Sequence, residues 1–440
     1  MKKGMGLVLL VIVFAIAGMP VLNGMIMENR VRQVFEDIHQ EARVTGSRPL
    51  FEILGYDRHL FSSEIEWKMV SKALENIGGI HEVVFLDRVR HGITKISTST
   101  GLEKNPWFLE LVNGKLNGKN PLTIKTEINF WGHMKSRVAL DAVSFMDGSQ
   151  TVDVKPGQAI LSMDWKKDRR VTEINFAGMD IPGKIKLDGF SWQSDLERVS
   201  GNIRAGRASF FLEEFQSSGP GKTTVSKAAF DYELLYHPEK ASVSIKTQGR
   251  LDSFQSGADE IKNIVAAFHI RQMDAGGYED LMGFLQEGLM DIITSGPLIL
   301  QDAHTVRRAM ERQAADKGFE WVGICGKLLK QGLEIEVSGL RARMPEGDME
   351  ADARIRFEND LPLAGVLSLM MDPSKVLSYL SLKSRIRLPK ILDPADRMLL
   401  SPLYPGMPTG LFLLEKDHLV HGAETREGKL FLNQKEVLFN

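Results

Sequence analysis

The chain has almost no cysteine: Cys325 is its single thiol among 440 residues. An intramolecular disulfide is therefore excluded, and the folded body must be stabilised by burial alone, which a chain of this length can supply. Cys325 lies in a Gly-Ile-Cys-Gly segment with no adjacent His or basic residue. We therefore interpret it as a packing residue rather than a nucleophile.

The chain also lacks an excess of charge of either sign. Its formal net charge is −2, so there is no bulk positive field that would hold nucleic acid. Hydrophobic residues make up 43% and charged residues 25%, a balance typical of globular proteins rather than disordered ones. The length predicts one large or two smaller folded units.

Signatures of known catalytic and metal sites are missing as well. No Gly-x-Ser-x-Gly nucleophile elbow occurs, and after His81 the second His of a zinc helix motif is replaced by Phe85. His418 and His421 are three positions apart, so on a strand they point to opposite faces and are poorly placed to share one ion. The sequence therefore predicts no catalytic, cofactor or metal residue, although an enzyme without a known signature stays open.

One segment resembles the end of a phosphate-binding loop. Residues 219–223 read Gly-Pro-Gly-Lys-Thr, but the first Gly of that motif is replaced by Gln216. The residues that follow, 225–236, alternate like a strand, whereas a phosphate-binding loop is followed by a helix. We therefore predict a Pro-Gly turn between two strands.

The N-terminus predicts the compartment. Lys2 and Lys3 precede an apolar run over 5–22 that resumes at 25–27, and the next charged residue is Glu28. About twenty apolar residues span a bilayer as a helix, and the preceding positive charges favour a cytoplasmic N-terminus. We expect residues 1–27 to be a retained single-pass anchor in a bacterial inner membrane, with the body in the periplasm. Cleavage as a signal peptide after Ala15-Ile16-Ala17 is the alternative.

Residues 28–45 are predicted to form a helix. Val31, Phe35, Ile38 and Ala42 recur at helical spacing between polar residues. We interpret this segment as a stalk that continues from the membrane. A seam between two copies of the chain is the alternative, although the segment is short for a coiled coil.

Beyond Gly46 the sequence predicts a mainly β fold (α+β), with large antiparallel, curved or repeated sheets and a few helices. Apolar residues occupy every second position over many short segments, which is the period of a strand with one face buried. Gly, Asp and Pro separate these segments as turn residues. The segments with this pattern are 65–69, 122–130, 159–165, 171–176, 185–187, 208–215, 225–236, 241–249, 333–337 and 351–357.

Two helices and two hairpins are predicted in the C-terminal half. Apolar residues recur at helical spacing over 278–293 and again over 303–317. Hairpin turns are predicted at 345–348 and within 428–433. The chain is therefore divided into β-rich regions 46–258 and 259–440. Arg307, Arg308 and Arg312 form a basic face, which is either a solvated helix surface or a docking face for an acidic partner or anionic lipid.

The segment Tyr56-Asp57-Arg58-His59-Leu60-Phe61-Ser62-Ser63 resembles the opening signature of the YdgA-like bacterial family, catalogued as domain of unknown function 945. His91-Gly92 stands where members carry His-Gly-Pro, and later turns match in order. The resemblance implies an uncleaved membrane anchor and a periplasmic body, but no assigned activity. Its candidate signature residues are Tyr56, Arg58, Phe61, Ser62, Ser63, His91 and Gly92.

The chain departs from the signature at His59, where members have Gly, and at Ile93, where they have Pro. If residues 56–63 form one alternating strand, Tyr56 and Arg58 share one face and Ser63 the other. Such a strand is interpreted as a sheet edge or a hinge cover rather than a ligand contact.

Function is predicted only by class. The first hypothesis is a membrane-anchored, non-catalytic module that binds or moves lipid or another amphiphile on the apolar face of its sheet, with no cofactor. The second is a structural or protein-interaction component of the envelope, joined as a homodimer or to another envelope protein through 28–44 or 278–293. An enzyme without a recognisable signature is the third.

Overall fold

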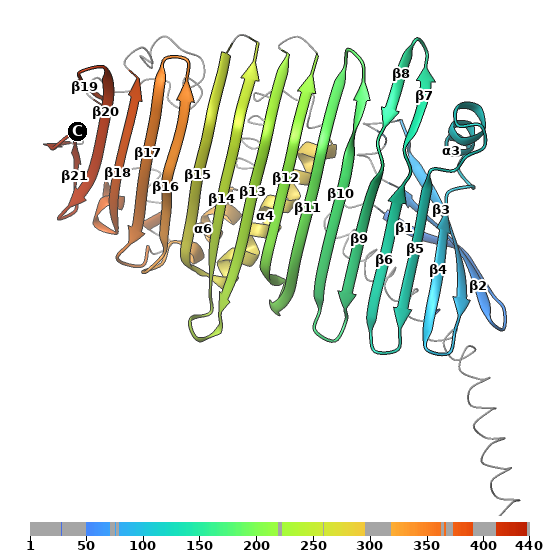
Figure 1. Cartoon of the computed structure of the whole chain (residues 1–440). Helices are drawn as coiled ribbons and strands as arrows, with labels where there is room; N and C mark the ends of the chain where they lie inside the picture. The colour runs from blue at the N-terminus through green and yellow to red at the C-terminus, as the bar shows by residue number, and fades with distance from the viewer. Residues whose placement is uncertain are drawn as a thin grey trace, which may run out of the picture. The chain divides into compact units, whose positions relative to one another are not determined.

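Figure 1 traces the chain in a computed structural model, which describes residues 28, 50–70, 75, 79–218, 222–257, 259–294, 318–361, 365–366, 373–389 and 411–437. Contacts divide the chain into two compact units. Unit 1 comprises Met1–Phe176 and Gly283–Ala315, and unit 2 comprises Ala177–Met282 and Asp316–Asn440. Strands dominate both units and pair antiparallel, which confirms the mainly β fold with few helices. The predicted anchor over 1–27 and all of the predicted stalk except Glu28 lie outside the described residues.

Unit 1 is built on an antiparallel sheet in which each strand pairs with the next: β1, β2, β3, β4, β5, β6, β9 and β10. Strands β7 and β8 pair with each other as a hairpin, and β8 also pairs with β10. The bounds are β1 (Leu50–Arg58), β2 (Ser62–Val70), β3 (Glu82–His91), β4 (Lys95–Gly101), β5 (Leu122–Asn129), β6 (His133–Leu140), β7 (Val143–Asp147), β8 (Gln150–Val154), β9 (Gly157–Asp164) and β10 (Arg169–Ile181).

One end of the unit 1 strands is closed by an apolar cluster. The short helix α3 (Pro106–Glu110) and the π-helical turn η1 (Leu111–Lys115) bring Phe108 and Val112 against Val83 and Leu102. Asn105 precedes the helix and is 2% exposed, and its side-chain amide exchanges hydrogen bonds with the backbone N–H and carbonyl of Val84 at 2.7 and 2.6 Å. We call this the closed end of unit 1.

Unit 2 continues the same architecture with longer strands. From β11 to β18 each strand pairs with its successor, and β18 then pairs with β20. The bounds are β11 (Ile185–Ser200), β12 (Ile203–Ser217), β13 (Thr223–His237), β14 (Ser242–Ser256), β15 (Asp259–Asp274), β16 (Glu334–Met344), β17 (Gly347–Phe357), β18 (Leu380–Pro389), β19 (Leu413–Glu415), β20 (His418–Arg426), β21 (Lys429–Leu432) and β22 (Lys435–Glu436). The 3₁₀ turns are η2 (Pro238–Lys240) and η4 (Pro373–Ser378).

In the described part of unit 2 and its boundary, the strands are interrupted by helices α4 (Ala275–Thr294) and α6 (Gly318–Leu328). Helix α4 covers the predicted segment 278–293, whereas the segment 303–317 lies outside the described residues. Helix α6 was not predicted, because Gly323 and Gly326 lower its helix propensity, and the burial of Val322 and Ile324 outweighs that cost. None of the helices in the described part of the chain combines the length and the apolar character of a bilayer-spanning segment.

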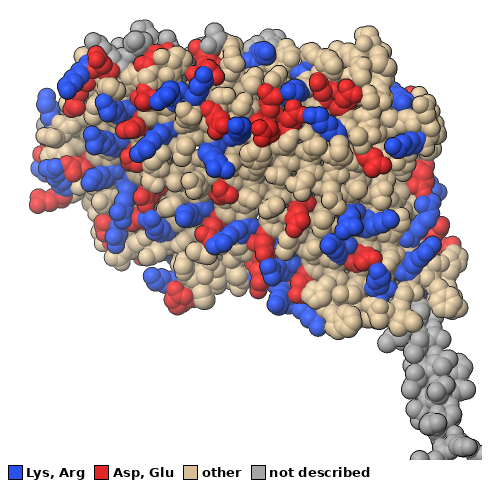
Figure 2. Space-filling model, viewed as in Figure 1, with Lys and Arg blue, Asp and Glu red and all other residues tan. Residues whose placement is uncertain are grey.

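The strands separate charged from apolar residues by face, as their period of two predicts. On β17, Glu350 and Asp352 lie opposite Arg387 and Arg385 of β18, and these side chains are exposed. On the other face, Ile355 lies opposite Leu382. Lys and Arg alternate with Asp and Glu over β15–β18 in Figure 2. The turns at 345–346 and 427–428 confirm the two predicted C-terminal hairpins.

Candidate functional site

The signature segment 56–63 forms a hairpin, so the single alternating strand predicted for it is wrong. Strand β1 ends at Arg58, β2 begins at Ser62, and the backbone N–H of His59 donates to the carbonyl of Ser62 at 2.8 Å. Leu60 and Phe61 look like strand residues in the sequence, but they are the exposed turn. The antiparallel register then places Arg58 directly opposite Ser63.

The hairpin brings Ser63 next to His91, the other half of the signature. Ser63 Oγ lies 3.1 Å from His91 Nε2, and the side chains are buried, with Ser63 1% and His91 5% exposed. Within the described residues, His91 Nδ1 has no hydrogen-bond partner. Burial, and then the nearby charge of Arg58, lower the pKa of His91. The imidazole is therefore neutral at neutral pH.

A Ser–His pair is the minimal arrangement for an activated serine nucleophile. Such a nucleophile needs access to substrate and a third group that orients the base. Ser63 is almost fully buried, and in the described part of the chain no carboxylate forms a hydrogen bond with His91 Nδ1. The pair therefore satisfies the criteria for a buried polar contact better than those for a catalytic dyad.

The remaining signature residues shape the turns beside this pair. The backbone N–H of His91 donates to the Phe61 carbonyl at 2.8 Å, which joins the β1–β2 turn to the end of β3. Gly92 begins the β3–β4 turn, and a Cβ at this position would lie 2.6 Å from the Lys95 carbonyl oxygen. Only glycine fits there without a backbone shift. Tyr56 and Ser62 are half-buried on the same hairpin.

A second polar group, Asp87, lies on the same face of β3 as His91. The indole Nε1 of Trp67 donates to its carboxylate at 2.9 Å, and the Thr100 hydroxyl also donates to it. Burial raises the pKa of Asp87 despite these hydrogen bonds. The face of β2–β4 that carries Asp87 and His91 therefore favours the neutral form of both ionisable groups.

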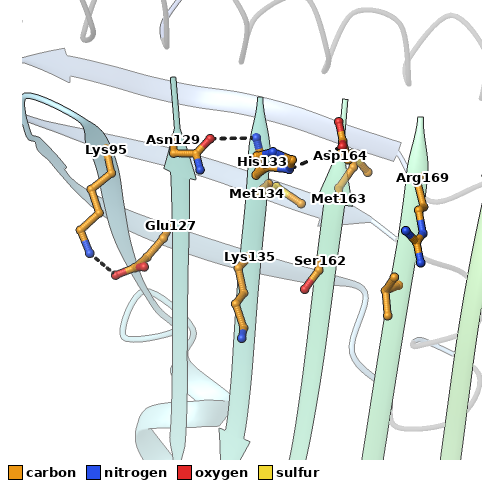
Figure 3. Close-up of a pocket in the computed structure, with 11 residues that line it drawn as sticks. Lys95, Glu127, Asn129, His133, Met134, Lys135, Ser162, Met163, Asp164 and Arg169 are labelled. Atoms are coloured by element: carbon orange, nitrogen blue, oxygen red, sulfur yellow. Dashed lines mark hydrogen bonds and ion pairs between the residues drawn. The ribbon is translucent and has the colours of Figure 1, made fainter. Parts of the chain in front are cut away.

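On the opposite face of the same sheet lies a polar groove with a volume of about 520 Å³. Lys95 of β4 donates to Glu127 of β5 at 2.7 Å, and His133 of β6 lies 3.7 Å from Asp164 of β9 (Figure 3). The hydrogen bond and charge of Lys95 lower the pKa of Glu127. The other lining residues are Asn129, Met134, Lys135, Ser162, Met163, Arg169 and Val171.

The groove is lined by both acidic and basic side chains, but these do not form a set of ligands typical of a metal site. Lys135 lies between Glu127 on β5 and Ser162 on β9 in the strand register. Ser162 offers a hydroxyl, and Lys135 and Arg169 offer cationic donors, which is chemistry suited to a polar or anionic group. Among the described residues, no cluster of three or more His, Cys, Asp or Glu is arranged to hold a metal ion.

Other sequence candidates are not brought to this site. Arg307, Arg308 and Arg312 lie outside the described residues. Residues 219–221 do too, but the segment after them is β13, the strand that was predicted.

The thiol and the paired histidines have separate surroundings in unit 2. His421 Nδ1 lies 3.0 Å from the Leu411 carbonyl, whereas His418 Nδ1 lies 3.3 Å from Arg387. Cys325 is half-buried beside the cluster of Val322 and Leu361, and burial raises its pKa. A raised pKa leaves the thiol protonated and weakly nucleophilic.

Sequence analysis missed the groove, because its residues come from five strands that meet only through pairing. The sequence did carry a signal for the turns beside the groove: aromatic residues directly follow alternating strands in Phe130-Trp131-Gly132 and Trp165-Lys166-Lys167. Turn positions more often carry Gly, Asn, Asp or Pro, so these aromatic residues mark unusual turns.

Comparison with known proteins identifies a family but no activity. Residues 1–438 match the family described as "Bacterial protein of unknown function (DUF945)". The chain therefore belongs to this family, as the signature residues predicted. Comparisons with curated proteins and with solved structures gave no match.

Proposed function

We propose that this protein is anchored in the bacterial inner membrane and binds a lipid or another amphiphile on the apolar face of its periplasmic β-sheet. It acts as a binding module rather than as an enzyme. The apolar run over 5–22, the two preceding lysines and the anchor that the resemblance to the family implies support this location.

One observation carries the binding role: the apolar face of the sheet is only partly buried along whole strands. On β17, Met349, Ala351, Ala353 and Ile355 are only partly buried, and burial is complete only at Phe357. The core of a globular sheet buries such residues fully, because each contributes about 25 cal/mol per Å² removed from water.

The same partial burial occurs in unit 1. Ile124 and Ile128 of β5 lie opposite Val138 and Met134 of β6, and all four are half-buried. A row of partly buried aliphatic residues offers surface to an acyl chain, while the charged face of the same strands remains in water. Ligand sites are typically apolar with a few polar groups, as this arrangement is.

Site-specific photo-crosslinking in the intact envelope tests the proposal. A benzophenone amino acid is placed at Ile355 or Leu382 on the apolar face of the full-length chain. Arg356 and Lys383 serve as matched controls, because each is the next residue on the same strand and points to the other face.

We expect an amphiphile adduct, identified by intact-protein mass spectrometry, at positions 355 and 382 and not at 356 and 383. A protein adduct at 355 would favour the envelope-interaction role instead. Equal labelling of both faces, or no adduct on either, would overturn the amphiphile proposal.

A further inference from the structure

Four turns of unit 1 lie at one end of its sheet, opposite the closed end. They are residues 59–61, 92–94, 130–132 and 165–168, between β1 and β2, β3 and β4, β5 and β6, and β9 and β10. The register places them together, since Ser62 pairs with Arg90, Lys95 with Asn129 and His133 with Asp164. In Figure 1 the last three of these turns lie at the lower end of the strands. We call these four turns the tip edge.

Large apolar side chains project from every turn of the tip edge. Between 45% and 60% of the surface of each is exposed. The six residues are Leu60, Phe61, Ile93, Phe130, Trp131 and Trp165. Single exposed apolar residues are common, but a contiguous set marks a surface that binds another apolar phase.

The turns are joined to one another, so the six side chains belong to one surface. The backbone N–H of Trp165 donates to the Gly132 carbonyl at 2.9 Å, which links the β9–β10 turn to the β5–β6 turn. At the other side of the edge, the N–H of His91 donates to the Phe61 carbonyl. The tip edge is therefore a fixed row rather than a set of independent loops.

Basic residues flank the apolar tip edge at its β9–β10 turn, beside Trp165. Lys166 and Lys167 follow Trp165 and are exposed, and Arg169 and Arg170 begin the next strand. The nearby Asp164 carboxylate accepts the backbone N–H groups of Lys166 and Lys167 at 3.0 and 3.3 Å. Those bonds hold the turn while both lysine side chains remain directed to solvent. Aromatic tips with flanking cations are complementary to an anionic lipid surface.

The chain itself reaches this edge from its apolar run. Arg58 Nη1, at the start of the β1–β2 turn, lies 3.4 Å from a carboxylate oxygen of Glu28. Glu28 is the first charged residue after Lys3, directly beyond the apolar residues 25–27. The residue that follows the predicted anchor is therefore in contact with Arg58, which directly precedes the first turn of the tip edge.

We infer that the tip edge docks on the surface of the membrane that holds the anchor, with its aromatic side chains in the interfacial layer and its lysines on anionic phospholipid headgroups. This inference rests on the inner-membrane location in the proposed function, but not on amphiphile binding by the sheet. Tryptophan suits this layer because its ring is apolar and its N–H needs a polar partner.

Spin-label accessibility on the full-length chain tests the docking. In a Cys325→Ser background, nitroxide-labelled cysteines are introduced as W131C and I93C at two different turns of the tip edge. The matched control is S149C in the β7–β8 turn, which follows the opposite ends of the strands. Each protein is placed in nanodiscs of phosphatidylethanolamine with phosphatidylglycerol, and collision rates with oxygen and with a water-soluble nickel complex are measured.

We expect a severalfold higher oxygen-to-nickel ratio at 131 and 93 than at 149, falling when phosphatidylglycerol is omitted or in the K166E/K167E variant. Equal ratios at the three positions would overturn the inference. Dipolar broadening between labels at 131 would assign the edge to a second copy of the chain and overturn it as well. Either result would leave the photo-crosslinking of the apolar face unchanged, so the two proposals fail separately.

Discussion

The two ends of the unit 1 sheet use similar residues for opposite purposes. At the closed end, Phe108 is 6% exposed inside a cluster that also holds Val83 and Leu102. At the tip edge, Phe130 is 46% exposed. An asparagine supports each end: Asn105 is buried and bonds to strand backbone, whereas Asn129 supports a solvated turn. The difference shows that residue type alone does not decide between core and surface.

The physical reason lies in the connections. Helix α3 and η1 fold over one end of β3 and β4 and remove Val83, Leu102 and Phe108 from water. The tip edge has only short turns, which have no backbone length to fold over their own side chains. Its apolar residues therefore stay available to another phase.

The largest expected contrast is between the two phenylalanines. Phe108→Ala should lower the stability of unit 1 by about 3–5 kcal/mol, because it leaves a cavity in a packed cluster. Phe130→Ala should change it by less than about 0.5 kcal/mol. Hydrogen exchange of β3 and β4 peptides in the full-length protein measures both free energies. Similar losses for the two variants would contradict the division into a closed and an open end.

The two asparagines should show the same contrast at smaller scale. Asn105→Ala leaves the Val84 N–H and the Val84 carbonyl without their partner, at a cost of about 2–3 kcal/mol. The Leu102 carbonyl loses the side-chain amide but keeps the backbone N–H of residue 105. Asn129 Oδ1 accepts the N–H groups of Trp131 and His133 at 3.1 and 3.0 Å. Water can replace it there, so Asn129→Ala should cost about 0.5–1 kcal/mol. Urea titrations of the two variants measure both losses of stability. A larger loss for Asn129→Ala than for Asn105→Ala would contradict this comparison.

The smallest expected effect is on the pH dependence of stability, and it comes from His91, which lies at the end of β3. Because the folded-state pKa of His91 is lowered below 6.5, the unfolded state binds its proton first as the pH falls. Stability should therefore decline below about pH 6.5, by at most about 1.4 kcal/mol per pH unit, until the folded-state pKa is passed. His91→Gln should flatten this slope between pH 7.5 and 5.5 in hydrogen-exchange measurements. An unchanged slope would show that His91 does not contribute to it.

The contribution of Asp87 to stability changes with pH in the opposite direction, so the effects of His91 and Asp87 can be separated. Its folded-state pKa is raised above 3.8, so the unfolded state loses its proton first as the pH rises. Its stabilising contribution is present at low pH and is lost as the pH rises through the folded-state pKa. Asp87→Asn should remove that dependence and leave the decline due to His91 in place.

Much of the strand content was predictable from the chain. The alternation over 122–130 predicted β5 together with its exposed charged face, and the turn residues at 345–348 predicted the β16–β17 hairpin. The same rule failed for residues 56–63, because Leu60 and Phe61 continue an apolar pattern through a turn. A pattern of period two cannot show where a chain reverses when the turn itself is apolar.

The sequence by itself determined the family, the two-faced strands and the signature residues, since each depends on residue type and local spacing. Only the tertiary structure decided that Ser63 meets His91, that five strands line one groove, and that four apolar turns share one edge. These outcomes depend on which strands pair and in what register, and a shift of one residue would reverse every face. Pairing joins residues 28 positions apart in the case of Ser63 and His91. Local propensity carries no information at that separation.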